Sequence, residues 1–135
     1  MDDILLIDSN PVNADNYQRF LTSAGFQVHL CDGLDEGLHH VSITVPGLII
    51  MDLAMMELPP ETILDRLRAA VPAQTSILVL ACPCLADDEA FCETLFRHGA
   101  DGCMAKPISR HDLLRHSHRL LDRVSEPSPI ATPRP

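Results

Sequence analysis

The sequence predicts an α/β protein of three layers, a doubly wound (βα)5 fold whose five-stranded parallel sheet lies between two layers of helices. Five short apolar runs alternate with amphipathic stretches along the chain. Apart from the run at 26–31, which alternates, these runs show little polar alternation, which is typical of strands buried on both faces in a parallel sheet. With 135 residues, the chain is long enough for one domain with its own core.

The first half of the chain supplies three of the expected strands, at residues 4–8, 26–31 and 47–52. Asn10 followed by Pro11 is a typical helix start, with an N-cap and then proline at the first helical position. The apolar face of that helix is Tyr17, Phe20, Leu21 and Ala24. Gly25 can end it, and a shorter helix follows the second strand. The positions that mark this shorter helix are Leu34, Leu38 and Val41.

The second half adds strands at 76–82 and 102–105 and three more helices. One helix follows Pro59 and Pro60, and another ends at Gly99. Ser109 and Asp112 resemble a capping box that opens the last helix. Four prolines in the stretch SEPSPIATPRP exclude regular structure there. We therefore expect one domain over residues 1–124 and a Pro-rich tail or linker over 125–135.

The composition excludes several classes of function. A formal net charge of −9 repels phosphate backbones, so we expect no nucleic acid partner for this domain. The longest apolar runs, about six residues, are far shorter than a membrane span, so we expect no membrane partner. No basic segment precedes a long apolar one at the N-terminus, and we expect a cytoplasmic protein.

The chain has five cysteines, and an odd number without a secretory signal favours reduced thiols. Cys82 and Cys84 form a C-x-C pair, and no second pair at zinc spacing follows. Small buried apolar residues are the favoured interpretation of all five. Any role for the Cys82/Cys84 pair stays open at this stage.

Three charged residues follow or end predicted strands: Asp8 the first, Asp52 the third and Lys106 the fifth. Ligands of open parallel sheets bind beyond the carboxyl ends of the strands. Two carboxylates with a lysine can hold a small hard cation and a phosphoryl group. The sequence therefore predicts a site for Mg²⁺ and phosphate at this edge.

The segments ILLIDSNP, GLIIMDLAMMELPP and GADGCMAKPIS resemble the receiver domain of bacterial response regulators, the CheY-like or flavodoxin-like fold. The resemblance covers residues 3 to 123 and implies that Asp52 is the phosphoacceptor. Asp8 falls on the first residue of the family's metal-binding acidic pair. Ala54 falls where the family uses a backbone carbonyl as a Mg²⁺ ligand. Lys106 falls on the lysine that contacts the phosphoryl group, and its bond to the following proline is often cis in the family.

Three positions depart from the family pattern. Ser9 replaces the second acidic residue, so we expect weakened Mg²⁺ affinity and a weak or water-mediated contact from its hydroxyl. Ala81 falls where a Thr or Ser bonds the phosphoryl group, and Cys103 falls where an aromatic residue moves in response. These substitutions predict an altered conformational switch.

Two interpretations of function remain open. In the first, the chain is a receiver of a two-component phosphorelay that accepts a phosphoryl group on Asp52 from a histidine kinase or phosphotransferase and signals to an output domain or partner protein. It is then no ordinary enzyme, although it can catalyse its own phosphoryl transfer and hydrolysis. In the second, it is a degenerate receiver that binds proteins independently of phosphorylation. A haloacid-dehalogenase-like phosphatase is disfavoured by Ala54, and a flavin site by the hydroxyl-poor segment SNPVNAD.

The last predicted helix is the basic part of an acidic chain. Its basic residues are Arg110, His111, Arg115, His116, His118, Arg119 and Arg123. A solvated helix face is the favoured interpretation. The alternative is a docking or homodimer surface on this helix.

Overall fold

The computed structural model describes residues 3–53 and 58–122. Its single sheet has five parallel strands in the order β2-β1-β3-β4-β5, which confirms the predicted doubly wound fold. The strands are β1 Asp3–Ile7, β2 Gln27–Cys31, β3 Leu48–Asp52, β4 Ser76–Ala81 and β5 Gly102–Ala105. The helices are α1 Pro11–Ser23, α2 Leu34–Ile43, α3 Pro60–Ala70, α4 Pro83–Ala86, α5 Glu89–Arg97 and α6 Arg110–Asp122.

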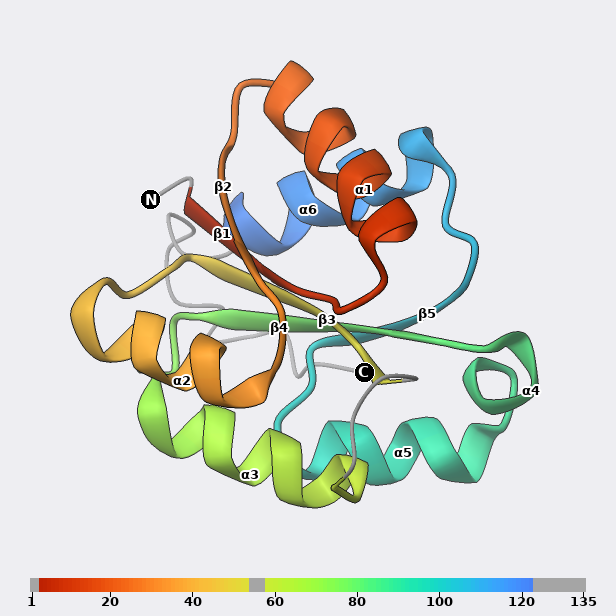
Figure 1. Ribbon diagram of the computed structural model, residues 1–135. Coiled ribbons are helices and arrows are strands. Elements are labelled where there is room, and N and C mark those ends of the chain that lie inside the picture. The colour runs from red at the N-terminus through yellow and green to blue at the C-terminus, as the bar shows by residue number, and fades with distance from the viewer. Residues whose placement is uncertain (1–2, 54–57, 123–135) are drawn as a thin grey trace.

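Helices cover both faces of the sheet. Figure 1 shows α1 and α6 on one face and α2, α3 and α5 on the other. Along β1, Leu5 and Ile7 pack toward α2 and α3, while Ile4 and Leu6 pack toward α1 and α6. Each such side chain contributes about 1.5–3 kcal/mol when fully buried. Alternate residues of one apolar strand therefore build two separate cores.

Burial on both faces holds for the three inner strands and not for the two edge strands. Every residue of β3 and β4 is buried, whereas four of the five residues of β2 are at least partly exposed. The four residues of β5 are all partly exposed. The strand order explains the difference, because an edge strand has a neighbour on one side only.

The predicted helix ends are largely confirmed. Asn10 Oδ1 accepts hydrogen bonds from two backbone N–H groups in the first turn of α1. The N–H of Asp112 donates to Ser109 Oγ at 3.1 Å, the first half of the expected capping box. Gly25 and Gly99 follow helices with φ of +98° and +110°, a conformation that favours glycine. The expected core position Ala24 is exposed, because α1 ends there.

The single-turn helix α4 is absent from the sequence-based prediction. Pro83 occupies its first position, and the N–H groups of Leu85 and Ala86 donate to the Cys82 carbonyl at 3.0 and 2.9 Å. Asp88 then caps α5, with its side chain accepting from the N–H of Phe91. A single turn carries no helical periodicity, so pattern analysis reads it as loop.

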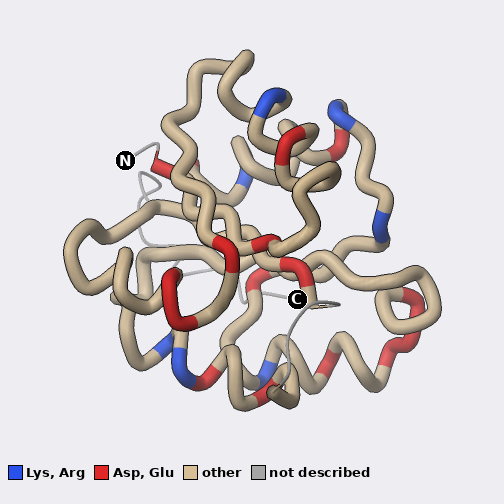
Figure 2. The backbone as a smooth tube through the Cα atoms, in the orientation of Figure 1, with Lys and Arg blue, Asp and Glu red and all other residues tan. Residues whose placement is uncertain are grey.

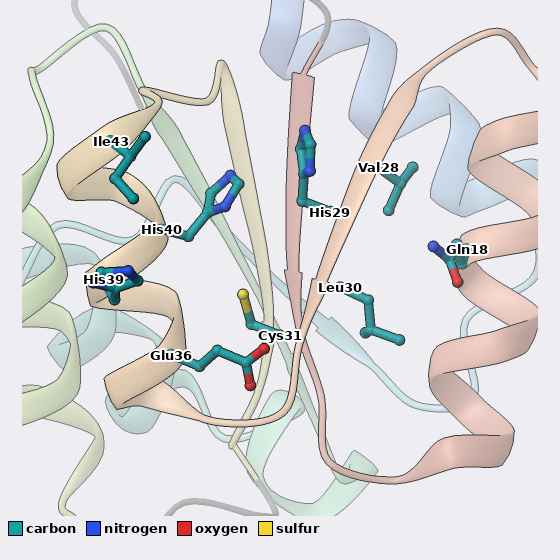
Figure 3. A pocket seen from close by; sticks show the side chains of 9 residues that line it. All are labelled: Gln18, Val28, His29, Leu30, Cys31, Glu36, His39, His40 and Ile43. Atoms are coloured by element: carbon teal, nitrogen blue, oxygen red, sulfur yellow. The ribbon is translucent and has the colours of Figure 1, made fainter.

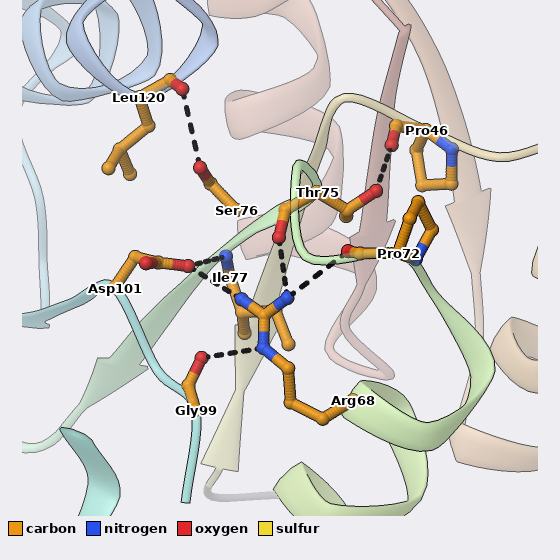
Figure 4. Close-up of polar contacts among 9 residues, drawn as sticks. All are labelled: Pro46, Arg68, Pro72, Thr75, Ser76, Ile77, Gly99, Asp101 and Leu120. Carbon is orange, nitrogen blue, oxygen red and sulfur yellow. Dashed lines mark hydrogen bonds and ion pairs between the residues drawn. The ribbon is translucent and has the colours of Figure 1, made fainter. Parts of the chain in front are cut away.

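A network around Arg68 links α3 to the amino edge of the sheet (Figure 4). Its guanidinium donates to the carbonyls of Gly99 and Thr75 and to Asp101 Oδ2, at 2.9, 2.7 and 2.7 Å. The same Asp101 oxygen accepts from the N–H of Ile77, the second residue of β4. The network holds α3, β4 and the segment before β5 together at the edge opposite the predicted site.

Within residues 3–53 and 58–122, no helix combines the length and hydropathy needed to cross a bilayer. The expected tail at 125–135 lies outside the described residues, and so does the end of the expected domain at residue 124. The cytoplasmic location expected from the sequence stays a prediction.

Candidate functional site

The charged residues predicted for the site lie at the carboxyl edge of the sheet. Asp52 ends β3, Asp8 follows β1 and Lys106 follows β5. Ile7 pairs with Met51 in the register of β1 and β3, so the next residues, Asp8 and Asp52, are neighbours across the sheet edge. Figure 2 shows acidic residues in red where β1, β2 and β3 end. Negative charge is therefore concentrated at the carboxyl ends of three neighbouring strands.

Asp52 is buried and ion-paired with Lys106. The residue is 2% exposed, and the Lys106 ammonium donates to both carboxylate oxygens, at 2.8 Å to Oδ1 and 2.9 Å to Oδ2. The carboxylate in this apolar run thus has a cation from the segment after β5, 54 positions away in the sequence. An ionised carboxylate becomes tolerable inside the protein when it is paired in this way.

Asp8 lacks a matching cation at contact distance. It is 3% exposed; its Oδ1 accepts from the Asn10 N–H at 2.9 Å, while its Oδ2 is buried with no hydrogen-bond partner in the described part of the chain. Burial raises the pKa of Asp8, and the charge of Asp52 raises it further; the Asn10 N–H and Lys106 oppose these effects. The carboxylate is therefore electrostatically unsatisfied.

Ser9 adds a second orphaned oxygen beside Asp8. Its Oγ is buried and also lacks a partner among the described residues. The carboxylates of Asp8 and Asp52 and the hydroxyl of Ser9 offer oxygen donors only, and those of Asp8 and Ser9 include oxygens without partners. Mg²⁺ prefers such hard oxygen ligands and usually keeps several waters, so these residues fit the ion.

The remaining metal ligand expected from the sequence lies outside the described residues. Ala54, whose carbonyl was expected to bind Mg²⁺, falls in the undescribed stretch 54–57. Across the two described ranges, no group of three or more His, Cys, Asp or Glu side chains is arranged to hold a metal. A cation at Asp8 and Asp52 would therefore need backbone carbonyls, Ser9 or water as additional ligands.

The two switch positions are placed on the strands beside the site. Ala81 ends β4, one residue beyond Leu80, the register partner of Asp52, and pairs with Ala105 of β5. Cys103 lies on β5, partly buried against the core under α5. Burial, together with the neighbouring Cys92 thiol, raises the pKa of Cys103 to about 12, so it stays a neutral thiol. Neither side chain is an aromatic ring or a hydroxyl.

A cavity of about 330 Å³ opens beside Lys106. It is lined by Asn13, Tyr17, Cys82, Pro83, Lys106 and Pro107. The Lys106–Pro107 peptide bond is cis, as expected, and the Lys106 N–H donates to the Ala81 carbonyl at 2.8 Å. The residues after β4 and β5 thus form the walls of a space that reaches the lysine of the ion pair.

A second and larger cavity, about 480 Å³, lies at the edge strand β2 (Figure 3). The rings of His29 and His40 face each other across it, with centroids 4.6 Å apart. Burial and the neighbouring His29 lower the pKa of His40, so that ring is neutral near pH 7. None of the residues that line this cavity was predicted for the site, because its two histidines come from different elements and share no sequence pattern.

The basic residues of helix α6 make contacts within the helix and with Phe26. Arg115 pairs with Asp112 at 3.3 Å, and Arg119 donates to His116 Nδ1 at 3.1 Å. Burial and then the two arginines lower the pKa of His116. The ring of His118 packs against Phe26 at 4.8 Å. These contacts agree with the interpretation of α6 as a solvated, internally paired helix face.

Comparison with protein families gives one match over most of the chain. The model of the response regulator receiver domain matches residues 4–118. The cell cycle transcriptional regulator CtrA of Caulobacter vibrioides is 28% identical over 120 residues, which cover 89% of this chain and 50% of that protein. The chain therefore spans about half the length of the curated relatives it matches.

Solved structures share the fold. A CheY-like receiver domain protein from Methanospirillum hungatei JF-1 superposes with a TM-score of 0.82 at 19% identity, covering 93% of this chain and 97% of that one. A receiver domain from Bermanella marisrubri gives 0.73 at 28% identity, covering 89% and 98%. The receiver domain of a Pseudomonas aeruginosa PAO1 sensor histidine kinase, with a magnesium ion coordinated in its active site cleft, gives 0.75 at 24% identity, covering 89% and 97%.

Proposed function

Since this chain belongs to the response regulator receiver domain family of two-component systems, we propose that Asp52 is its phosphoacceptor and that Mg²⁺ assists the transfer. The observation that carries the proposal is the ion pair between Asp52 and Lys106 beside the unsatisfied carboxylate of Asp8. This arrangement supplies a nucleophile, a cation for the phosphoryl group and a place for a divalent metal in one small volume.

The chain's own residues have distinct tasks in this transfer. A carboxylate oxygen of Asp52 attacks the phosphorus of the donor, and the bond to the donor's leaving group breaks. Lys106, whose ammonium now bonds both Asp52 oxygens, shifts its donors toward the phosphoryl oxygens as charge arrives there. Hydrolysis of the acyl phosphate by water returns Asp52 to its carboxylate form.

Asp8, Asp52, Ser9 and the Ala54 carbonyl are the residues that would hold the metal. Mg²⁺, when bound, offsets the charge of the incoming phosphoryl group. Asp8 and Asp52 supply the two negative charges, and Ser9 supplies only a neutral hydroxyl. We therefore expect Mg²⁺ affinity to be weaker than with a second carboxylate at position 9.

The residues at the two switch positions should weaken the conformational response to phosphorylation. A hydrogen bond to a charged group is worth about 1.5–3 kcal/mol, and Ala81 has no hydroxyl that could donate one to the phosphoryl group. Cys103 has no ring to turn inward. A phosphorylation-independent binding module is the alternative, and the experiment below separates the two.

Partners follow from the proposed chemistry. A histidine kinase or a phosphotransferase donates the phosphoryl group, and an output domain or partner protein reads it. CtrA is described as a transcriptional regulator about twice as long as this chain. We expect this acidic domain itself to make no nucleic acid contact. A homodimer through α6 is a further candidate, tested by the self-association of Arg115→Glu.

The test is Mg²⁺-dependent labelling by acetyl phosphate, followed by intact-mass measurement. We expect one phosphoryl group on the wild type, none on Asp52→Asn and normal labelling of Asp35→Asn, an exposed control on α2. Ser9→Asp should label at a lower Mg²⁺ concentration. Absence of labelling in the wild type, or equal labelling of Asp52→Asn, would refute the proposal and favour the binding module.

A further inference from the structure

Four of the five cysteines gather around the short helix α4. Cys82 and Cys84 flank Pro83 at its start. Cys92 on α5 donates to the Ala86 carbonyl at 3.2 Å and lies beside Cys103 of β5. The fifth, Cys31, is buried on β2. The interpretation of all the cysteines as small buried residues is therefore correct for Cys31 and wrong for Cys84, which is exposed.

The Cys82 and Cys84 thiols touch each other at the surface. Their Sγ atoms are 2.8 Å apart, and Cys82 is partly exposed. A disulfide bond measures about 2.03–2.05 Å, so the two sulfurs need to approach by less than about 1 Å. The single residue between them keeps both thiols on the same turn, which removes most of the search that more distant cysteines require.

The surroundings of Cys82 also suit a nucleophilic thiol. The Cys84 thiol, the Leu85 N–H and the positive charge of Lys106 each lower the pKa of Cys82. The same contact raises the pKa of Cys84. Thiolates, not thiols, attack disulfides. The deeper Cys103, whose pKa is raised to about 12, is inert by comparison.

We propose that Cys82 and Cys84 form a redox modification site, which closes to an intramolecular disulfide by exchange with a low-molecular-weight disulfide such as oxidised glutathione. The Cys82 sulfur attacks one sulfur of the reagent, forming a mixed disulfide and releasing one thiol. The Cys84 sulfur then attacks the Cys82 sulfur and releases the second thiol. Two electrons pass from the protein to the reagent, and the two protein protons end on the released thiols.

The resulting bond is reversible rather than structural. It closes a ring of three residues at an exposed position, and strained or exposed disulfides are the readily reduced ones. An ordinary cellular dithiol can therefore reopen it. The site responds to the thiol–disulfide balance around the protein.

The position of the pair connects it to the cavity beside Lys106. Cys82 and Pro83 line that cavity together with Lys106 and Tyr17. Closing the Cys82–Cys84 ring ties the Cys82 sulfur covalently to its partner and so fixes this part of the cavity wall. The second part of the proposal, which rests on the proposed function, is that oxidation slows the approach of phosphodonors to Asp52.

The first experiment maps the disulfide itself. The reduced full chain is incubated with oxidised glutathione, free thiols are alkylated, and peptides are identified by mass. We expect loss of alkylation at Cys82 and Cys84 only, a mass lower by two hydrogens, and recovery with dithiothreitol. Cys84→Ser should stop at the glutathione adduct on Cys82, while Cys92→Ser should still close the ring. A persistent adduct in the wild type, or a Cys92–Cys103 linkage instead, would overturn the assignment.

The second experiment measures acetyl phosphate labelling of reduced and oxidised protein. We expect at least about threefold slower labelling after oxidation. Reductant should restore the rate, and the effect should be absent when Cys82 and Cys84 are both replaced by Ser, because that variant forms neither the disulfide nor the glutathione adduct at these positions. Equal rates would overturn the connection to the cavity while leaving the disulfide in place. If the reduced protein does not label at all, the proposed function fails, whereas the mapping experiment still decides the redox site.

Discussion

Replacing Asp8 by Asn should stabilise the metal-free protein. Asp8 is 3% exposed, one of its carboxylate oxygens has no partner in the described structure, and Asp52 lies beside it with the same charge. The amide of Asn keeps an oxygen for the Asn10 N–H and removes the negative charge. The substitution therefore relieves a penalty without creating a cavity.

The size of the effect follows from the charge that is removed, because the Asn amide nitrogen takes the place of the orphaned oxygen. A buried group without a partner costs about 1–3 kcal/mol, and more when it is charged. We expect Asp8→Asn to raise the free energy of unfolding by about this amount at neutral pH. In a chain of this length, 1 kcal/mol corresponds to roughly 3–5 °C in Tm.

The sign of the pH dependence gives an independent check. Since the pKa of Asp8 is higher in the folded than in the unfolded chain, its penalty is absent below the unfolded pKa and complete above the folded pKa. The stability difference between Asp8→Asn and wild type should therefore be largest near pH 7.5 and shrink as the pH falls toward about 4.

Urea denaturation in EDTA, repeated with MgCl2, is the assay. The exposed Asp15, paired with Arg19 on α1, gives a matched control, and Asp15→Asn should change stability by less than about 0.5 kcal/mol. Mg²⁺ at ten times its Kd should stabilise the wild type by about 1.4 kcal/mol and Asp8→Asn by much less. If Asp8→Asn is less stable than wild type in EDTA, the account of the site as an unsatisfied acidic cluster is wrong.

Three further outcomes test other parts of the structure. Lys106→Met removes the ammonium from Asp52 and should destabilise the metal-free protein by about 3–5 kcal/mol. Mg²⁺ should then stabilise this variant more than it stabilises the wild type. An equal gain in the two proteins would contradict a site at Asp52 that Lys106 and the metal share. Arg68→Ala breaks the network at the amino edge, and urea denaturation should show that the free energy of unfolding falls by about 2–4 kcal/mol. The exposed control Arg19→Ala should lower it by less than about 0.5 kcal/mol. Similar losses in the two variants would mean that the network adds nothing to stability. Ser117 is fully buried with no partner for its hydroxyl in the described structure, so Ser117→Ala should leave stability unchanged or raise it by about 1 kcal/mol, and a clear loss in thermal unfolding would reveal a bonded hydroxyl.

Much of the fold could be predicted because its signals are local. Each inner strand is an uninterrupted apolar run, and each long helix has a periodic apolar face with a cap or a glycine at its end. The short helix α4 was missed because one turn contains too few positions to show a period. The run at 26–31 shows alternation, but the extent to which β2 is exposed depends on strand order, which no single segment encodes.

The candidate site, like the fold, could be predicted from the sequence only in part. The sequence by itself placed Asp8, Asp52 and Lys106 at the ends of strands, since strand ends are visible as the limits of apolar runs. Only the tertiary structure decided that the Lys106 ammonium bonds both oxygens of Asp52 while Asp8 keeps an unpaired one. The contact between the Cys82 and Cys84 thiols and their place on the Lys106 cavity also required it. The physical reason is range: periodicity and capping act over a few residues, whereas charge pairing and burial depend on distances between segments that only the folded chain brings together.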